Sequence, residues 1–251
     1  MSAWESAGGV QAPPALRLDG VSTLFGSFRA LDDVSLTVGA GEALGIVGPN
    51  GAGKTTLLNV IGGTLRADRG SLAFHGRDIT RLASHHHCRV GIGRTFQIPR
   101  PFAGLTAYEN ILVAHTYGRS GDDREAERAC LAMLGTVGLR EKANTVAGSL
   151  TLLQRKRLEL ARALVTKPRL LLIDEVAGGL TEPEVKELVE TVKQVRADGV
   201  AIIWIEHIVH ALLSVVDRLL CLAEGRVLIE GDPHEVMASP KLRDVYLGGE
   251  L

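Results

Sequence analysis

The stretch Gly48-Pro-Asn-Gly-Ala-Gly-Lys-Thr55 decides the fold of this 251-residue chain. It fits the pattern G-x-x-x-x-G-K-[ST], it follows the apolar run 42–47, and a helical pattern starts after Lys54. Glycines let the backbone wrap closely around an anion because they have no Cβ atom. The N–H groups of such a loop, at the start of a helix, attract phosphate. The sequence therefore predicts a phosphate loop that binds a nucleoside triphosphate.

Single side chains of this loop have separate expected roles. Lys54 reaches the outer phosphates and takes part in catalysis, and the hydroxyl of Thr55 is a ligand of Mg²⁺. The other loop residues expected to contact the nucleotide are Pro49, Asn50, Gly51, Ala52, Gly53 and Thr56.

A second apolar run, 170–173, ends in the adjacent acids Asp174 and Glu175. Two carboxylates at the end of a buried strand are costly unless something cationic faces them. In a phosphate-loop fold, the end of such a strand lies near the metal. We therefore expect Asp174 to hold Mg²⁺ through water, and Glu175 to orient or polarise the attacking water as a catalytic residue.

The order of the remaining patterns predicts the fold class. The apolar runs 169–173 and 200–205 are continuous, as strands covered on both faces of a parallel sheet should be. The amphipathic pattern 185–195 between them predicts a helix, so strand, helix and strand follow one another with a crossover connection. Residues 16–38 contain short β-type stretches. We therefore expect an α/β fold of the P-loop NTPase class.

The middle of the chain, at about 100–165, has mostly helical patterns. Its best helix begins near Asp122, which together with Glu125 resembles an N-terminal cap. We expect this part to be a helical subdomain beside a β-rich nucleotide-binding lobe. The expected boundaries are a flexible tail at 1–14 and one domain at 15–251.

Composition disfavours several other classes of protein. The 28 Lys and Arg balance 29 Asp and Glu, and aromatic residues make up 4%, so a general nucleic-acid binder is not expected. The three cysteines are far apart, which fits a reducing compartment and no disulfide scaffold. No apolar run reaches the roughly 18–20 residues of a membrane span. We therefore expect a cytoplasmic protein, with the tandem histidines His85, His86 and His87 on a surface loop.

Several further stretches, in order and spacing, resemble the ATP-binding subunit of an ABC transporter from about Leu16 to Gly248. The stretches that carry this resemblance, besides the two already described, are Arg94-Thr-Phe-Gln97 at the Q-loop, Leu150-Thr-Leu-Leu-Gln154 in the place of the signature, Arg157-Leu-Glu-Leu-Ala-Arg-Ala-Leu164 after it, Gly178-Gly-Leu-Thr181 at the D-loop, His207 as the switch histidine, and the closing segment 224–236.

The resemblance implies roles for five more residues, with ATP and Mg²⁺ as the bound cofactors. Phe25 lies where the family stacks an aromatic ring on adenine. Gln97 would act on both the metal and the reaction, and His207 would reach the γ-phosphate. Thr151 and Gln154, in the signature, would contact the ATP that is held by the other subunit.

The stretches 94–102, 105–110 and 245–248 look like those of the ATPases of branched-chain amino acid importers. This likeness implies ATP hydrolysis that powers solute uptake, on the inner face of the membrane. The implied partners are a second ABC ATPase subunit, in a homo- or heterodimer, transmembrane permease subunits and a solute-binding protein. The helical subdomain near Gln97 would receive the coupling helix of the permease.

The signature departs from the family's usual Leu-Ser-Gly-Gly-Gln. Thr151 and Gln154 still form a capping box, so Leu152 and Leu153 would begin a helix whose N–H groups point outwards. The bulk of the two leucines would hold the partner's nucleotide farther away. One alternative therefore stays open, a nucleotide-binding regulatory subunit with weakened hydrolysis. The cations at 155–157 either face solvent or face a bound phosphate.

Overall fold

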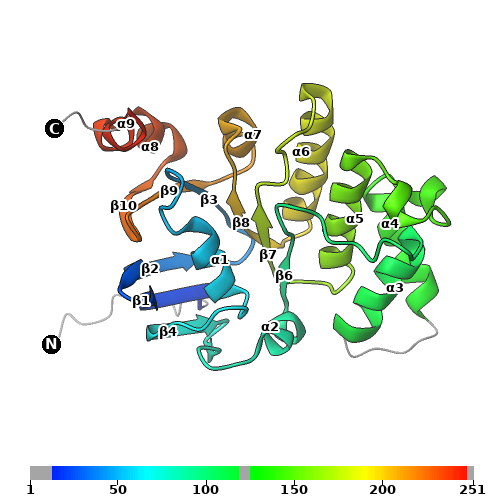
Figure 1. Cartoon of the computed structure of the whole chain (residues 1–251), viewed down its shortest axis with the longest axis horizontal. Coiled ribbons are helices and arrows are strands. Elements are labelled where there is room, and N and C mark those ends of the chain that lie inside the picture. Colours follow the sequence, from blue (N-terminus) through cyan, green and yellow to red (C-terminus); the bar gives the residue numbers. More distant parts are fainter. Residues whose placement is uncertain (1–12, 119–124, 248–251) are drawn as a thin grey trace, which may run out of the picture.

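The computed structural model describes residues 13–118 and 125–247. Most of the tail predicted at 1–14, and Asp122, lie outside these residues. In the described part, an antiparallel sheet and a larger, mostly parallel sheet enclose a helix, and a group of helices lies at one end of the molecule (Figure 1). The α/β fold expected from the sequence is confirmed, whereas the domain boundaries at 1–14, 15–251 and about 100–165 stay predictions.

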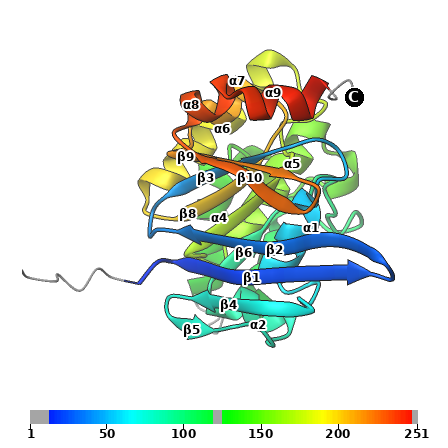
Figure 2. The ribbon, with the colours of Figure 1, turned by 90° about the vertical axis from the view of Figure 1, so that its left-hand side faces the viewer.

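The smaller sheet has the strand order β2-β1-β4-β5 and is antiparallel throughout. Its strands run side by side across the molecule in Figure 2. They are β1 (Leu16–Phe25), β2 (Phe28–Val38), β4 (Arg69–Phe74) and β5 (Arg77–Asp78).

The larger sheet has the strand order β10-β9-β3-β8-β7-β6, and all its neighbours pair in parallel except β9 and β10. Its strands are β3 (Ala43–Val47), β6 (Ile92–Arg94), β7 (Leu170–Asp174), β8 (Ala201–Ile205), β9 (Arg218–Ala223) and β10 (Arg226–Gly231). Because β3, β7 and β8 are parallel, the segments that follow them leave the sheet at the same edge, where ligands bind in α/β sheets.

The helices surround the larger sheet. They are α1 (Lys54–Ile61), α2 (Ser84–Val90), α3 (Ala107–Gly118), α4 (Ala126–Thr136), α5 (Leu152–Leu164), α6 (Glu182–Ala197), α7 (Val209–Leu213), α8 (Pro233–Ala238) and α9 (Pro240–Leu247), with single 3₁₀ turns η2 (Arg140–Lys142) and η3 (Ala147–Ser149). None of the helices in the described ranges is long and apolar enough to cross a membrane.

Strand β7 shows why its sequence is a continuous apolar run. Leu170 and Leu172 pack with α1 and the smaller sheet, while Leu171 and Ile173 pack with α5 and α6 on the opposite face. Alternate side chains of a strand point to opposite faces, so a strand covered on both faces needs apolar residues at every position. Helices α3, α4 and α5 build a separate apolar cluster at the far end of the molecule (Figure 1).

Two local expectations were wrong or differ in detail. The tandem histidines lie in helix α2 rather than on a loop, and His87 is buried, with its Nδ1 2.9 Å from the carbonyl oxygen of Ile61. A polar side chain is buried there because a backbone oxygen pairs with it. Helix α4 starts at Ala126, and Glu125 at its N-cap makes no side-chain capping bond.

Candidate functional site

The phosphate loop has a backbone that only glycine fits at two positions. Gly48 and Gly53 have φ values of 148° and 100°. A Cβ atom at Gly48 would lie 2.0 Å from the carbonyl oxygen of Leu222, and one at Gly53 would lie 2.4 Å from that of Ala30. The loop is therefore seated tightly between β2 and β9, which positions it at the start of α1.

Lys54, the first residue of α1, folds back over the loop. Its Nζ donates hydrogen bonds to the carbonyl oxygens of Gly48, at 2.6 Å, and Pro49, at 2.9 Å. Burial lowers the pKa of this lysine, and the nearby Glu175 and Asp174 oppose that effect. A cation held over an anion-binding loop is already at the place where outer phosphates would bind.

A cavity of 390 Å³ opens beside the loop. Two exposed aromatic rings, Phe25 (53% exposed) and Phe28 (61%), stand at its edge where β1 turns into β2. The residues that complete its lining are Ala30, Asn50, Gly51, Ala52, Gly53, Lys54, Thr55, Thr56, Gln97 and Glu175. The sequence reasoning named Phe25 but missed Phe28, which the short Phe-Gly-Ser-Phe turn placed directly opposite it.

Asp174, at the end of β7, is 3% exposed, and its Oδ1 has no hydrogen-bond partner among the described residues. Its Oδ2 lies 3.6 Å from Nη2 of Arg94. Burial raises the pKa of this carboxyl group, against the lowering effect of Arg94. An orphaned, buried carboxylate oxygen is a rare and costly feature that a bound cation would compensate. Asp174 and the exposed Thr55 hydroxyl are therefore suited to Mg²⁺, a cation that prefers oxygen ligands.

Glu175 is held on both sides of its carboxylate. Nε2 of Gln97 donates to its Oε2 at 2.5 Å, and Nε2 of His207 lies 2.6 Å from its Oε1. The three residues come from the segments that follow β6, β7 and β8, so the parallel sheet brings together residues that are up to 110 positions apart in sequence. The structure thus brings together three side chains that were predicted separately, Glu175 from the end of its strand and Gln97 and His207 from the resemblance.

A buried glutamate, Glu206, supports this arrangement and was missed in the sequence. Its Oε1 accepts a hydrogen bond from Ala177 N at 2.8 Å, and its Oε2 accepts one from His207 N at 3.0 Å. Glu206 therefore ties the segment after Glu175 to the segment that carries His207. Its position at the end of an apolar strand, just as for Asp174, was the signal that could have revealed it.

The signature segment begins helix α5, and its predicted capping box is confirmed. Thr151 Oγ1 accepts from Gln154 N at 3.3 Å, and Gln154 Oε1 accepts from Thr151 N at 3.0 Å. Neither residue lines the cavity at the phosphate loop. Leu152 Cδ2 lies 3.3 Å from the point where a Cβ atom on Gly179 would be, so the signature lies beside the segment after Glu175.

Lys156, two residues into the basic run after the signature, does not face solvent. It is 4% exposed, and burial lowers its pKa while the negative charges of Glu206 and Glu175 raise it. The alternative in which the whole run 155–157 is solvated is therefore wrong for Lys156, because the helix turns this position toward the acidic strand ends.

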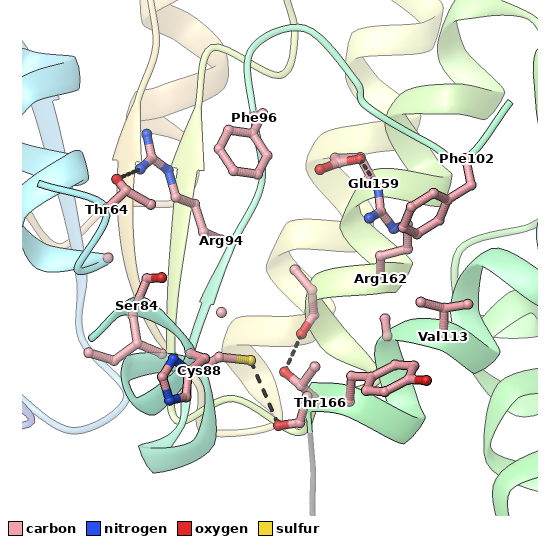
Figure 3. Close-up of a pocket in the computed structure, with 18 residues that line it drawn as sticks. Thr64, Ser84, Cys88, Arg94, Phe96, Phe102, Val113, Glu159, Arg162 and Thr166 are labelled. Carbon is pink, nitrogen blue, oxygen red and sulfur yellow. Dashed lines mark hydrogen bonds and ion pairs between the residues drawn. The ribbon is translucent and has the colours of Figure 1, made fainter. Parts of the chain in front are cut away.

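A groove of 410 Å³ lies between the larger sheet and the helical cluster, beside the segment that carries Gln97 (Figure 3). Aromatic side chains line it, among them Phe96, Phe102 and Tyr117. The guanidinium groups of Arg94 and Arg100 lie 5.0 and 5.5 Å from the centre of the Phe96 ring. Phe96 is followed in the chain by Gln97, whose side chain donates a hydrogen bond to Glu175, so the groove wall is linked to this carboxylate through one residue.

Comparison with known proteins agrees with this geometry. The family model described as ABC transporter matches residues 31–178. Among curated proteins, the lipopolysaccharide export system ATP-binding protein LptB of Acidithiobacillus ferridurans is 37% identical, over 91% of this chain and 96% of its own length. The high-affinity branched-chain amino acid transport ATP-binding protein BraF of Pseudomonas aeruginosa is 34% identical, over 94% of this chain and 98% of its own.

Solved structures give the same result. A nucleotide-free ATP-binding cassette from an ABC transporter superposes with a TM-score of 0.87 at 32% identity, covering 94% of this chain and 99% of that one. A cassette in its ADP conformation superposes with a TM-score of 0.86, at the same identity and coverage. The fold, the nucleotide-binding loop and these matches together show that the chain belongs to the ABC transporter family, as an ATP-hydrolysing, ATP-binding subunit.

Proposed function

We propose that the cavity beside the phosphate loop binds ATP with Mg²⁺ and hydrolyses it. The observation that carries the proposal is the convergence of Lys54, Gln97, Glu175 and His207 at one edge of the sheet. Phe25 stacks on the adenine, and Lys54 holds the outer phosphates. The loop residues Pro49, Asn50, Gly51, Ala52, Gly53 and Thr56 contact the nucleotide.

Thr55, Gln97 and Asp174 are the proposed metal ligands, directly or through water. Mg²⁺ at this place would neutralise charge on the phosphates. Glu175 accepts a proton from, or orients, the attacking water, because its carboxylate faces the cavity. Gln97 and His207 both contact that carboxylate, and in the proposed reaction they would turn toward the γ-phosphate.

The site needs a second ATPase subunit to complete it. Thr151 and Gln154 start a helix outside this chain's own cavity, which supports their use on ATP bound to a partner. Two unequal subunits fit this proposal better than two copies, because the bulk of Leu152 and Leu153 would crowd the γ-phosphate of ATP held by the partner. A partner with an ordinary signature would complete the site built on Lys54 and Glu175.

The transport cycle that we infer is solute uptake, with branched-chain amino acids or related compounds as the cargo. The relatives BraF and LivG carry the transport of branched-chain amino acids in their names, and the LptB relative carries lipopolysaccharide export. Uptake is favoured by the stretches 94–102, 105–110 and 245–248. We place the chain in the cytoplasm, on the inner face of the membrane, with permease subunits and a solute-binding protein as partners.

The groove of Figure 3 is the proposed docking site for a short helix of the permease. Its exposed aromatic rings suit an apolar helix face, and its wall continues into Gln97. Movement of a docked helix would therefore shift the side chain that holds Glu175. This link would couple closure around ATP to the membrane subunits.

The test is the variant Glu175→Gln in the complex with a co-expressed ATPase partner and permease. ATP binding is expected to persist, while single-turnover hydrolysis falls about 100-fold or more, because removal of one preorganised group at the reacting centre has an effect of this size. If the intact complex never turns over and Glu175→Gln makes no difference, the alternative of a regulatory subunit holds. The observation in favour of that alternative is the pair Leu152 and Leu153.

A further inference from the structure

Arg94 lies at the junction of three parts of the site, beneath one wall of the groove (Figure 3). Its Nη1 donates hydrogen bonds to Asn59 Oδ1, at 2.7 Å, and to Thr64 Oγ1, at 3.3 Å. Its Nη2 lies 3.6 Å from Asp174 Oδ2. The side chain of Arg94 is 9% exposed, and its contacts with Asn59 and Asp174 are at least partly sheltered from solvent, which holds it in place.

Two partners of Arg94, Asn59 and Asp174, belong to elements that carry proposed metal ligands. Thr55 is the second residue of α1, and Asn59 lies about one turn further along the same helix. Asp174 is the last residue of β7. A planar guanidinium group with several donors holds such partners in a fixed geometry, which a flexible ammonium group does not. Arg94 therefore sets the spacing between the helix and the strand end.

Arg94 also determines which oxygen of Asp174 is free. The guanidinium group lies beside Oδ2, whereas Oδ1 is buried and without a partner in the described chain. The carboxylate is thus turned so that one oxygen faces the arginine and the other is left for a cation. A carboxylate with both oxygens free would have no such preference.

We propose that Arg94 is a positioning residue for the Mg²⁺ site, which orients Asp174 and holds it at a fixed spacing from Thr55. The inference rests on the proposed function, in which Asp174 and Thr55 hold the metal. Phe96, stacked on the same guanidinium group, connects this support to the groove. A helix docked in the groove thereby acts on both acids of the strand end, on Asp174 through Arg94 and on Glu175 through Gln97.

The experiment compares the affinity for a non-hydrolysable ATP analogue in excess Mg²⁺ with the affinity in EDTA. The ratio of the two affinities measures what the metal contributes to binding. For Arg94→Gln we expect this ratio to fall about 10- to 100-fold, the usual effect of removing a residue that orients a metal ligand. The affinity in EDTA is expected to stay unchanged, because Arg94 does not line the nucleotide cavity.

Two further variants keep the inference testable if Arg94→Gln does not fold. Arg94→Lys keeps the charge but loses the planar guanidinium group with its several donors. Asn59→Ala removes the hydrogen-bond acceptor of Arg94 Nη1 and leaves Asp174 unchanged. Both should lower the ratio by a smaller factor. Arg169→Gln is the matched control, since Arg169 also lies over a phenylalanine ring, Phe74 at 5.1 Å, and its ratio should equal that of the wild type.

The outcomes separate the inference from the proposed function. A wild-type ratio of one, or a ratio that Asp174→Asn leaves unchanged, contradicts the proposed metal site itself. If the wild type binds the analogue more tightly in Mg²⁺ than in EDTA, and all three variants at Arg94 and Asn59 keep the same ratio, the inference about Arg94 is overturned while the proposed function stands. Equal losses in Mg²⁺ and in EDTA would also overturn it, because they would assign to Arg94 a general structural role.

Discussion

At the scale of single residues, Glu175 has the most unusual backbone conformation among the residues of the proposed site that carry a Cβ atom. Its φ of 46° lies in the left-handed region, which a residue with a Cβ atom adopts at a cost of about 1 kcal/mol or more. The strand ends there, and the turn aims the carboxylate at Gln97 and His207. Glu206 accepts hydrogen bonds from Ala177 N and His207 N, and these bonds hold the turn in place. The strain is therefore stored at the group that we propose to act on water.

A second acid, Glu159 of α5, leads to a prediction about how the stability of the fold depends on pH. It is buried, it accepts hydrogen bonds from Arg162 at 2.9 Å and Arg100 N at 3.3 Å, and burial raises its pKa in spite of these partners. The folded chain therefore binds this proton more tightly than the unfolded chain does. The stability that protonation supplies is present at low pH and is lost as the pH rises from about 4.5 through the raised pKa.

The variant Glu159→Gln removes this titration and keeps an acceptor for both partners. We expect its free energy of unfolding, relative to the wild type, to increase as the pH rises from about 4.5 through the raised pKa of Glu159. Urea unfolding at several pH values measures the difference. Glu109→Gln is a control of opposite sign, because hydrogen bonds from Thr106 lower the pKa of Glu109. A difference for Glu159→Gln that is constant with pH would contradict the prediction.

At the scale of elements, the C-terminal helix α9 reaches back to the phosphate loop. The backbone N–H of Gly48 donates a hydrogen bond to the hydroxyl of Tyr246 at 2.9 Å, and the carbonyl of the same glycine accepts from Lys54. Leu242 of α9 is buried in the core beneath the larger sheet. The helix is thus anchored on one face and supports the loop with its last turn.

We predict that Tyr246→Phe weakens ATP binding about 5-fold. The phenyl ring keeps the packing, while Gly48 N loses its acceptor, and an unmade hydrogen bond of this kind costs about 1 kcal/mol. Titration with a fluorescent ATP analogue measures the change. Tyr108→Phe is the matched control, because Tyr108 packs in the helical cluster around α3 and is expected to bind ATP as the wild type does. Equal affinities for both variants would show that α9 does not support the loop.

These elements also show what the sequence could predict. The strand, loop and helix around Lys54, the strands that end at Asp174 and Ile205, and the capping box at Thr151 follow from patterns within a few neighbouring residues, and all are confirmed. Contacts over long separations were missed, such as Tyr246 with Gly48. Local periodicity carries no information on which distant side chains meet, since tertiary packing decides that.

At the scale of the whole molecule, the two ends of the site belong to different composite sites in the proposed dimer. In that dimer, Lys54 and Glu175 would act on ATP that faces the partner's signature, while Leu152 and Leu153 of this chain would face ATP held by the partner. The side chain of Leu152 lies beside Gly179, in the segment after Glu175. Loss of one preorganised donor slows such chemistry about 100- to 1000-fold.

We therefore predict unequal effects from the two catalytic glutamates in a complex with a different ATPase subunit. Glu175→Gln should lower steady-state ATP turnover about 100-fold, because this chain's site performs nearly all of it. The same change in the partner should leave turnover within about twofold, since the site facing Leu152 and Leu153 contributes little even when intact. In the background Leu152→Gly with Leu153→Gly, the partner's glutamate should become important, which assigns the asymmetry to the bulk of the signature. Equal losses from the two glutamate variants in the unmodified complex would instead mean that leucines at the start of α5 leave the partner's phosphate fully accessible.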